Sequence, residues 1–300
     1  MDLVTFAERL PQDGETVVGE RFVTYPGGKG ANQAVAVARL GMPAAMVGRV
    51  GDDTFGPQLV ELLQSAGVDT RGVGITSNAS SGIAVISIGE GAQNRIVQVL
   101  GANNTCGAAE FDVVAGLLPR ASALMLQLEV SVNLSMRVAG LAAQQGVSVM
   151  LDPGPVRPIP AEFFASVSII TPNETEAEAL VGFPIVDLNA AQAAANELIR
   201  RGVGAAVIKM GSQGAYWCDG STSGHEPAFP VMAVDTVAAG DAFNGALATA
   251  LATGQSLPDA VRWASAAGAV AVTKIGAQDS MPTFAEVAAL AATRSATGSS

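Results

Sequence analysis

Short apolar runs and longer segments with helical spacing alternate through the second half of the chain. From about Ser122 the apolar runs have strand length, and the segments between them are rich in alanine and often end at glycine. The pattern predicts strands at 124–128, 147–151, 167–170 and 205–210, and helices at 131–145, from Pro172 onward and at 190–201. Strands that alternate with helices predict a parallel sheet covered by helices on both faces.

The first hundred residues follow a different pattern. An extended stretch is predicted at 16–25, and apolar runs at 83–88 and 96–99 flank Gly89-Glu90-Gly91, which indicates a hairpin. The partly alternating pattern is typical of a sheet with one covered face. The remaining predicted elements are helices at 31–40, 54–66, 240–252 and 257–273 and a strand at 45–50.

These elements predict two structural units. The expected α/β core comprises 26–81 and 100–292, and a small discontinuous β-sheet comprises 3–25 and 82–99. Such a sheet is suited to act as a lid over a ligand site. Residues 293–300 are small and polar, and we expect them to form a flexible tail.

Composition narrows the function classes. The net charge is -11 and no run of lysine and arginine occurs, which argues against a nucleic-acid-binding protein. Cys106 and Cys218 lie far apart, so two free thiols are expected rather than a disulfide framework or a zinc site. No apolar run is long enough to span a bilayer and no signal-peptide pattern occurs, so we expect a cytoplasmic protein.

The segment with the clearest chemistry is Asp235-Thr-Val-Ala-Ala-Gly-Asp-Ala-Phe-Asn-Gly245. Small side chains at Ala238, Ala239 and Gly240 are expected to leave the backbone N–H groups of Ala239, Gly240 and Asp241 open at the start of a helix, where the helix dipole favours an anion. This arrangement predicts an anion hole for a transferring phosphoryl group. Asp241 sits at the same helix start, where it is suited to accept a proton from an attacking hydroxyl.

A second candidate is Gly27-Gly-Lys-Gly-Ala-Asn-Gln-Ala34. Its glycines allow a ligand to approach the backbone, and Lys29 and Asn32 can hydrogen-bond hydroxyl groups. It is not a Walker A loop, because Gly30 stands where Ser or Thr is required after Gly-Lys. It is not a dinucleotide fingerprint either, because Gln33 occupies the place of the third glycine.

Together these two segments resemble the signatures of the pfkB family of carbohydrate kinases, in the form found in ribokinases. The resemblance spans nearly the whole chain, from Asp2 to about Pro282. It implies a ribokinase-like three-layer α/β/α fold with a mostly parallel central sheet and a β-sheet lid. It also implies that Asp241 is the catalytic base, and that the sugar is bound by Asp2, Gly28, Lys29, Asn32, Glu129 and Asp241.

The resemblance extends to the nucleotide side. The spacing of Asn173 and Glu176 matches the family's N-x-x-E motif, which implies contacts with nucleotide phosphates and, through water, with Mg²⁺. A helix N-cap with its partner three residues later explains the same pair structurally. The implied nucleotide-binding residues are Asn173, Glu176, Lys209, Gly211, Ser212, Gly214, Gly240 and Ser265.

Ribokinases also bind a monovalent cation near the anion hole. The implied K⁺ ligands in this chain are Asp235, Val237, Ala271, Lys274, Gly276 and Ser280. Family members usually carry an additional strand ending in Gly-Ser-x-Asn before the position of Asp2, whereas this sequence begins at Met1. We expect Asp2 to keep its sugar-contacting role without that neighbouring asparagine.

The predicted activity is transfer of the γ-phosphate of ATP to the primary 5-hydroxyl of D-ribose, with Mg²⁺ and K⁺ as cofactors and a homodimer formed through the lid. Deoxyribose, a ketohexose or a nucleoside is an alternative substrate. A non-catalytic sugar sensor is an alternative from another class, as is a nicotinamide dehydrogenase. A hydrolase triad is disfavoured, because His225 is the only histidine and no G-x-S-x-G motif accompanies it.

Overall fold

The computed structural model describes residues 1–89 and 94–295, and a six-stranded sheet lies at its centre. Four strands of this sheet are parallel and lie between helices on both faces, which explains their continuous apolar sequences. Two antiparallel strands complete one edge. The strands, in spatial order, are β12 (Ser223–Glu226), β11 (Ala215–Cys218), β10 (Ala205–Lys209), β9 (Ile169–Ile170), β8 (Ser148–Leu151) and β7 (Ala123–Leu126).

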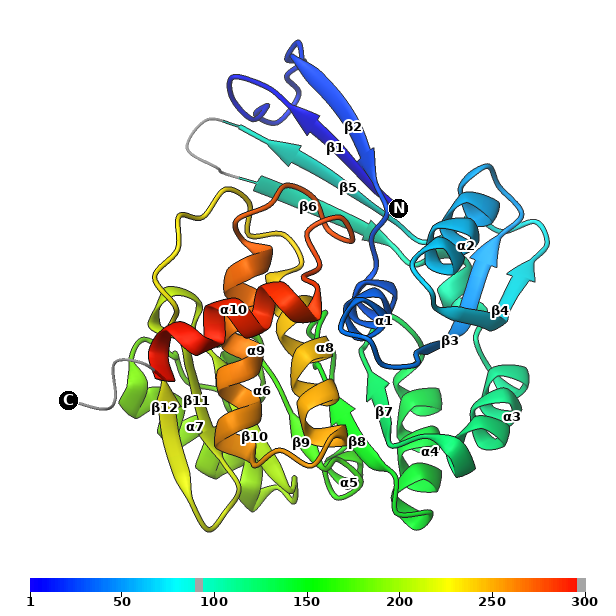
Figure 1. Cartoon of the computed structure of the whole chain (residues 1–300). Coiled ribbons are helices and arrows are strands. Elements are labelled where there is room, and N and C mark those ends of the chain that lie inside the picture. The colour runs from blue at the N-terminus through cyan, green and yellow to red at the C-terminus, as the bar shows by residue number, and fades with distance from the viewer. Residues whose placement is uncertain (90–93, 296–300) are drawn as a thin grey trace.

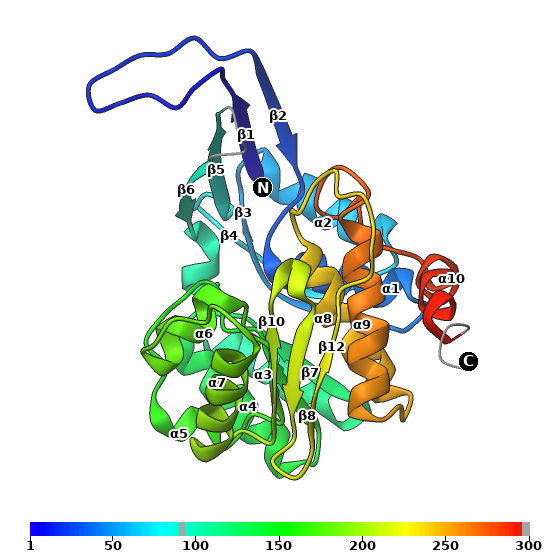
Figure 2. The ribbon, with the colours of Figure 1, turned by 90° about the vertical axis from the view of Figure 1, so that its left-hand side faces the viewer.

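Helices cover both faces of this sheet, which gives three layers (Figure 2). One hydrophobic cluster joins the sheet to α3 (Ala108–Leu117), α4 (Val132–Gln144), α5 (Ala161–Phe164), α6 (Glu174–Val181) and α7 (Leu188–Arg200). A second cluster joins the opposite face to α8 (Ala239–Ala252), α9 (Leu257–Ala271) and α10 (Phe284–Ser295). The layers confirm the predicted α/β/α arrangement.

Helix α1 (Lys29–Arg39) packs directly against α8, and this contact positions the site described below. Gly245 makes the close approach possible, because a Cβ at this position would lie only 2.5 Å from the Cβ of Ala36. The first turns of the two helices, from the two motif segments of the sequence, therefore lie side by side.

A separate four-stranded sheet stands above the core in Figure 1. Its strand β1 pairs antiparallel with β2 and parallel with β5, and β5 pairs antiparallel with β6. Their order is β2 (Arg21–Tyr25), β1 (Asp2–Phe6), β5 (Ile83–Ile88) and β6 (Asn94–Val99). The sheet lies within the segments predicted to form a lid, and part of the predicted hairpin turn lies outside the described residues.

Strands β3 (Ala45–Gly51) and β4 (Asp69–Thr76) form a parallel pair beside α2 (Phe55–Ser65). In the part of the chain that the structure describes, β3 shares no ladder with β7, the last strand of the central sheet. A cavity of about 1800 Å³ instead extends along α1 to both strands, and Met46 and Met125 are among the residues that line it there. The β3–β4 pair is therefore connected to the central sheet through α1 rather than through a β-ladder.

Several elements were not predicted from the sequence, namely β1, β4, α3, α5, β11, β12 and α10. Within residues 1–89 and 94–295, short 3₁₀ segments also occur at Gly101–Thr105, Leu118–Arg120 and Gly211–Gln213. Of the tail expected at 293–300, residues 293–295 belong to α10 and the rest lie outside the described residues.

The two cysteines are free and buried, as the sequence predicted. None of the helices described over residues 1–89 and 94–295 is both long and apolar enough to cross a bilayer.

Candidate active site

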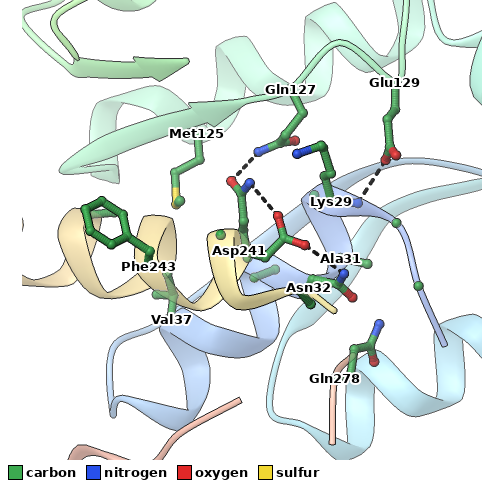
Figure 3. Close-up of a pocket in the computed structure, with 18 of the residues that line it drawn as sticks. Lys29, Ala31, Asn32, Val37, Met125, Gln127, Glu129, Asp241, Phe243 and Gln278 are labelled. Carbon is green, nitrogen blue, oxygen red and sulfur yellow. Dashed lines mark hydrogen bonds between the residues drawn. The ribbon is translucent and has the colours of Figure 1, made fainter. Parts of the chain in front are cut away.

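Asp241 occupies the first turn of α8, where it is 5% exposed. Its carboxylate accepts hydrogen bonds from Asn32 Nδ2 at 2.8 Å and Gln33 Nε2 at 3.0 Å, both from α1 (Figure 3). Burial is the main influence that raises the pKa of Asp241; Asp152 adds to it, whereas Lys29 and the two amide donors oppose it. The carboxylate is thus oriented by fixed donors at the wall of the cavity.

The loop before α8 forms the turn that the sequence predicts to bind an anion, called the anion-binding turn below. Ala238, the N-cap residue, has φ 57° and ψ 11°, a left-handed conformation that is unfavourable for alanine. The N–H of Ala239 donates to Thr236 O at 3.4 Å and that of Asp241 donates to Ala238 O at 3.0 Å. Among residues 1–89 and 94–295 the N–H of Gly240 has no partner. This differs from the expectation that all three amides are open.

The predicted sugar-binding residues gather on the side of the cavity nearest the lid. Gly28 has φ 99° and begins α1, and the N–H of Lys29 donates to Glu129 Oε2 at 2.9 Å. Asp2 lies against Gly27, where a Cβ would come within 2.3 Å of the Asp2 carboxylate oxygens. Burial is the main cause of the raised pKa values of both Asp2 and Glu129. The structure brings these residues into one cavity with Asp241.

Glu129 also connects this side of the cavity to the lid sheet. Its Oε1 accepts a hydrogen bond from Gln98 Nε2, on β6, at 2.7 Å. The carboxylate is therefore shared between the start of α1 and the small sheet.

The ammonium group of Lys29 points away from Glu129 and toward other carboxylates. Its Nζ lies 3.1 Å from Asp152 Oδ2 and 3.5 Å from Glu176 Oε1. Burial opposes this charge, but Asp152, Asp241 and Glu176 outweigh it and raise the pKa of Lys29. Gly154 leaves room for this ion pair, because a Cβ at that position would lie 2.3 Å from Glu176 Oε1 and 2.7 Å from Lys29 Nζ. The sequence predicted a sugar contact for this side chain, whereas the structure directs it toward Glu176, a predicted nucleotide-side residue.

Asp152, Gln33 and Gln127 were not identified from the sequence. Gln33 Nε2 donates to Asp152 at 2.9 Å as well as to Asp241, and its Oε1 accepts from Gln127 Nε2. Asp152 follows β8 directly and is 1% exposed. A carboxylate after a buried parallel strand, at the same sheet edge as Glu129, was the available signal.

Asn173 and Glu176 form the helix cap that their spacing predicts. Asn173 is the N-cap of α6 and accepts from the N–H of Glu176 at 2.8 Å, while Glu176 Oε2 accepts from the N–H of Asn173 at 2.9 Å. This capping box leaves Glu176 Oε1 directed toward Lys29. Capping therefore does not exclude a role in binding phosphate or Mg²⁺.

The loop after β10 lines the same cavity. Gly211 and Gly214 have φ 49° and 94°, and Lys209, Ser212 and Gly214 all contribute to the wall. Ser265, on α9, also lines it, and its Oγ is buried with no hydrogen-bond partner in the described part of the chain. These residues, with Asn173 and Gly240, form the predicted nucleotide side.

The residues predicted to bind a monovalent cation come from the loop before α8 and from the segment that follows α9. Asp235 connects these two segments by hydrogen bonds. Its carboxylate accepts from the N–H of Val237 and the N–H of Gly276, each at 3.0 Å. The other three residues are Ala271, at the end of α9, Lys274, whose N–H donates to Ala271 O, and the buried Ser280, whose Oγ donates to Ala277 O. Carboxylate, hydroxyl and carbonyl oxygens suit a hard cation, and a carboxylate that accepts two hydrogen bonds retains lone pairs.

Comparisons with known proteins agree with this geometry. The sequence profile of the pfkB family carbohydrate kinases matches residues 1–284. The ribokinase of Haemophilus influenzae is 37% identical over 285 residues, which is 95% of this chain and 93% of that protein. The deoxyribokinase of Salmonella typhi is 35% identical over 285 residues, again covering 95% and 93%. The structure of Arabidopsis thaliana ribokinase complexed with ribose and ATP has a TM-score of 0.88 at 34% identity, covering 97% of this chain and 95% of that one.

Proposed function

The chain belongs to the pfkB family of carbohydrate kinases and has its ribokinase-like fold, and we propose that it transfers the γ-phosphate of ATP to the 5-hydroxyl of D-ribose. The observation that carries the proposal is the placement of Asp241. Its buried carboxylate is held by Asn32 and Gln33 at the start of α8 and faces the cavity that Glu129 and Lys209 also line. An acceptor hydroxyl and a phosphoryl group can therefore meet beside one oriented base.

The chain's own residues divide the chemistry between them. Asp2, Gly28, Asn32 and Glu129 would bind the sugar, and Asp241 would remove the proton of its primary hydroxyl as that oxygen attacks phosphorus. The start of α8, with the free N–H of Gly240, would stabilise the negative charge of the transferring group.

Mg²⁺ is implied by the family, and the donor set fits it. Glu176 uses Oε2 in the helix cap, and its Oε1 lies 3.5 Å from Lys29 Nζ, next to Asn173 and Glu174, which line the cavity. A carboxylate at this place would reach a phosphate-bound ion through water. Mg²⁺ would neutralise phosphate charge. K⁺ would occupy the loops around Asp235, five residues before Gly240, and would stiffen the anion-binding turn.

The lid is proposed to close over the sugar and exclude water that would otherwise accept the phosphoryl group. The proposed homodimer would use the outer face of this sheet. Phe22, Val85, Val97 and Val99 share one face by register and are 60%, 39%, 64% and 44% exposed. Clustered exposed apolar side chains are typical of an interface. Light scattering should show a dimer that Val97→Lys converts to a monomer; a wild-type monomer would contradict this.

A coupled ADP-release assay tests the activity. Ribose, deoxyribose, a ketohexose and a nucleoside are compared at saturating Mg²⁺-ATP, with and without K⁺. We expect turnover with ribose to exceed that with the other sugars and to rise with K⁺. Preference for deoxyribose would reassign the substrate, and sugar binding without any turnover would favour the sensor alternative.

A further inference from the structure

The ammonium group of Lys209 lies at the start of α8. Its side chain, at the end of β10, is 12% exposed, and Nζ lies 3.5 Å from Asp152 Oδ1. A Cβ at Gly240 would lie 3.4 Å from this Nζ. Lys209 therefore contributes more than a loop backbone to the cavity, because its charge reaches the anion-binding turn itself.

Asp152 holds a second lysine on its other oxygen. Lys29 Nζ is 3.1 Å from Oδ2, so two ammonium groups from different elements converge on one buried carboxylate. Burial alone would raise the pKa of Asp152, but the two lysines lower it. Glu176 also pairs with Lys29, so Asp152 and Glu176 together balance the two ammonium charges. Asp152 is the only ion-pair partner of Lys209 among the described residues, so the ammonium group of Lys209 retains N–H groups that can bind an anion in the cavity.

The same unit is connected to the base. Gln33 donates to both Asp152 and Asp241, which fixes the two lysines relative to the carboxylate that receives the proton. A phosphoryl group bound between Lys209 and the N–H of Gly240 would lie where the attacking oxygen must approach.

From this geometry we propose that the ammonium group of Lys209 binds the γ-phosphoryl group of ATP, and that Asp152 is the positioning residue that holds it there. The proposal rests on the kinase function proposed above. Lys209 also serves as the counter-ion of Asp152 Oδ1, since Lys29 and Gln33 both donate to Oδ2. That role alone does not explain why its Nζ lies beside Gly240 at the wall of the cavity.

The γ-phosphoryl group distinguishes ATP from ADP, so calorimetric binding of Mg²⁺-AMP-PNP and Mg²⁺-ADP tests the contact without any sugar. We expect Lys209→Met to weaken AMP-PNP binding about 10- to 100-fold and ADP binding less than about threefold, because one charged hydrogen bond is lost. Lys209→Gln removes the charge but keeps a polar partner for Asp152, and it provides the same test if the methionine variant does not fold. Equal weakening of both nucleotides, or of neither, would overturn the contact.

Asp152→Asn tests positioning, with Glu110→Gln as the matched control. Glu110 is also buried and pairs with Arg49 at 2.7 Å, on α3, outside the catalytic machinery. We expect only Asp152→Asn to reduce the preference for AMP-PNP, by about tenfold. It should also move the acid limb of the kinetic pH profile to lower pH, because the charge of Asp152 raises the pKa of Asp241.

An Asp152→Asn protein that matches the control in both measurements would overturn the positioning role. The proposed sugar specificity can be refuted independently of this inference. A wild-type protein that does not phosphorylate ribose, but whose AMP-PNP preference depends on Lys209, would refute the substrate and support this inference.

Discussion

Replacing Asp241 with asparagine should abolish most phosphoryl transfer and leave the protein folded. General-base catalysis typically contributes about 10²- to 10⁴-fold, so kcat should fall by that factor, equivalent to about 3–5 kcal/mol in the barrier. Ribose affinity should change little, because an amide still offers one oxygen to its neighbours and the other sugar contacts remain.

The structure also predicts the effect on stability. Asn32 Oδ1 is buried with no hydrogen-bond partner in the described residues, so a rotated Asn32 amide can accept from the new side chain. Asp241 has a raised pKa, so its ionisation at neutral pH opposes folding, and that penalty disappears at pH values below the unfolded pKa. The asparagine variant should therefore melt at or above the wild-type temperature at neutral pH.

The assay combines ADP release, ribose calorimetry and thermal unfolding. Asp187→Asn is the matched control, since Asp187 caps α7 away from the cavity and asparagine is an equally good cap. Turnover within about tenfold of wild type would refute the assignment of Asp241 as base. A variant that loses ribose binding together with turnover would show that Asp241 acts mainly in binding.

Three further predictions follow from the same site. The kcat/KM for ribose should fall as the pH is lowered, and the fall should begin above the ordinary pKa of a carboxyl group, because Asp241 must be ionised and its pKa is raised. A fall that begins only at or below the ordinary carboxyl pKa would contradict this. Gly154→Ala should reduce kcat at least about tenfold with the fold retained by circular dichroism, since a Cβ there displaces Lys29 from Glu176; unchanged kcat would show that this ion pair is dispensable. Ala238→Gly should shift the unfolding free energy by less than about 1 kcal/mol, whereas Ala238→Val should destabilise by more than that, because a β-branched residue is strongly disfavoured at φ 57°; equal denaturation midpoints would remove the strain argument.

The catalytic end of the site could be predicted because its residues lie in contiguous segments. Asp241 and its turn form a helix start, and Asn32 lies four residues after Gly28, which begins the neighbouring helix. Local sequence is sufficient to place such groups on helix termini.

The polar network behind them could not be predicted in this way. Gln33 connects Asp152 and Asp241, which are 119 and 208 residues away, and the connection exists only because α1 packs closely on α8. The direction of the Lys29 side chain depends in the same way on where the fold places Asp152 and Glu176. A sequence motif identifies the residue but not the partner toward which its side chain turns.

Strand β4 shows the same limit for the fold. Gly72 and Gly74 lower its strand propensity, yet a Cβ at Gly72 would lie 2.8 Å from Met46 O on β3. The glycine that obscures the strand in the sequence is the one that lets it approach its neighbour.

The absence of a ladder between β3 and β7 affects how fast the backbone amides of β3 exchange hydrogen with solvent, and strand β8 provides the comparison. Strand β8 has ladder partners on both sides, whereas β3 pairs only with β4 in the described part of the chain. Amide protection should therefore be continuous along β8 and alternate along β3, where every second peptide group faces the cavity. At β3, a residue can therefore be buried while its backbone amide still exchanges hydrogen with solvent.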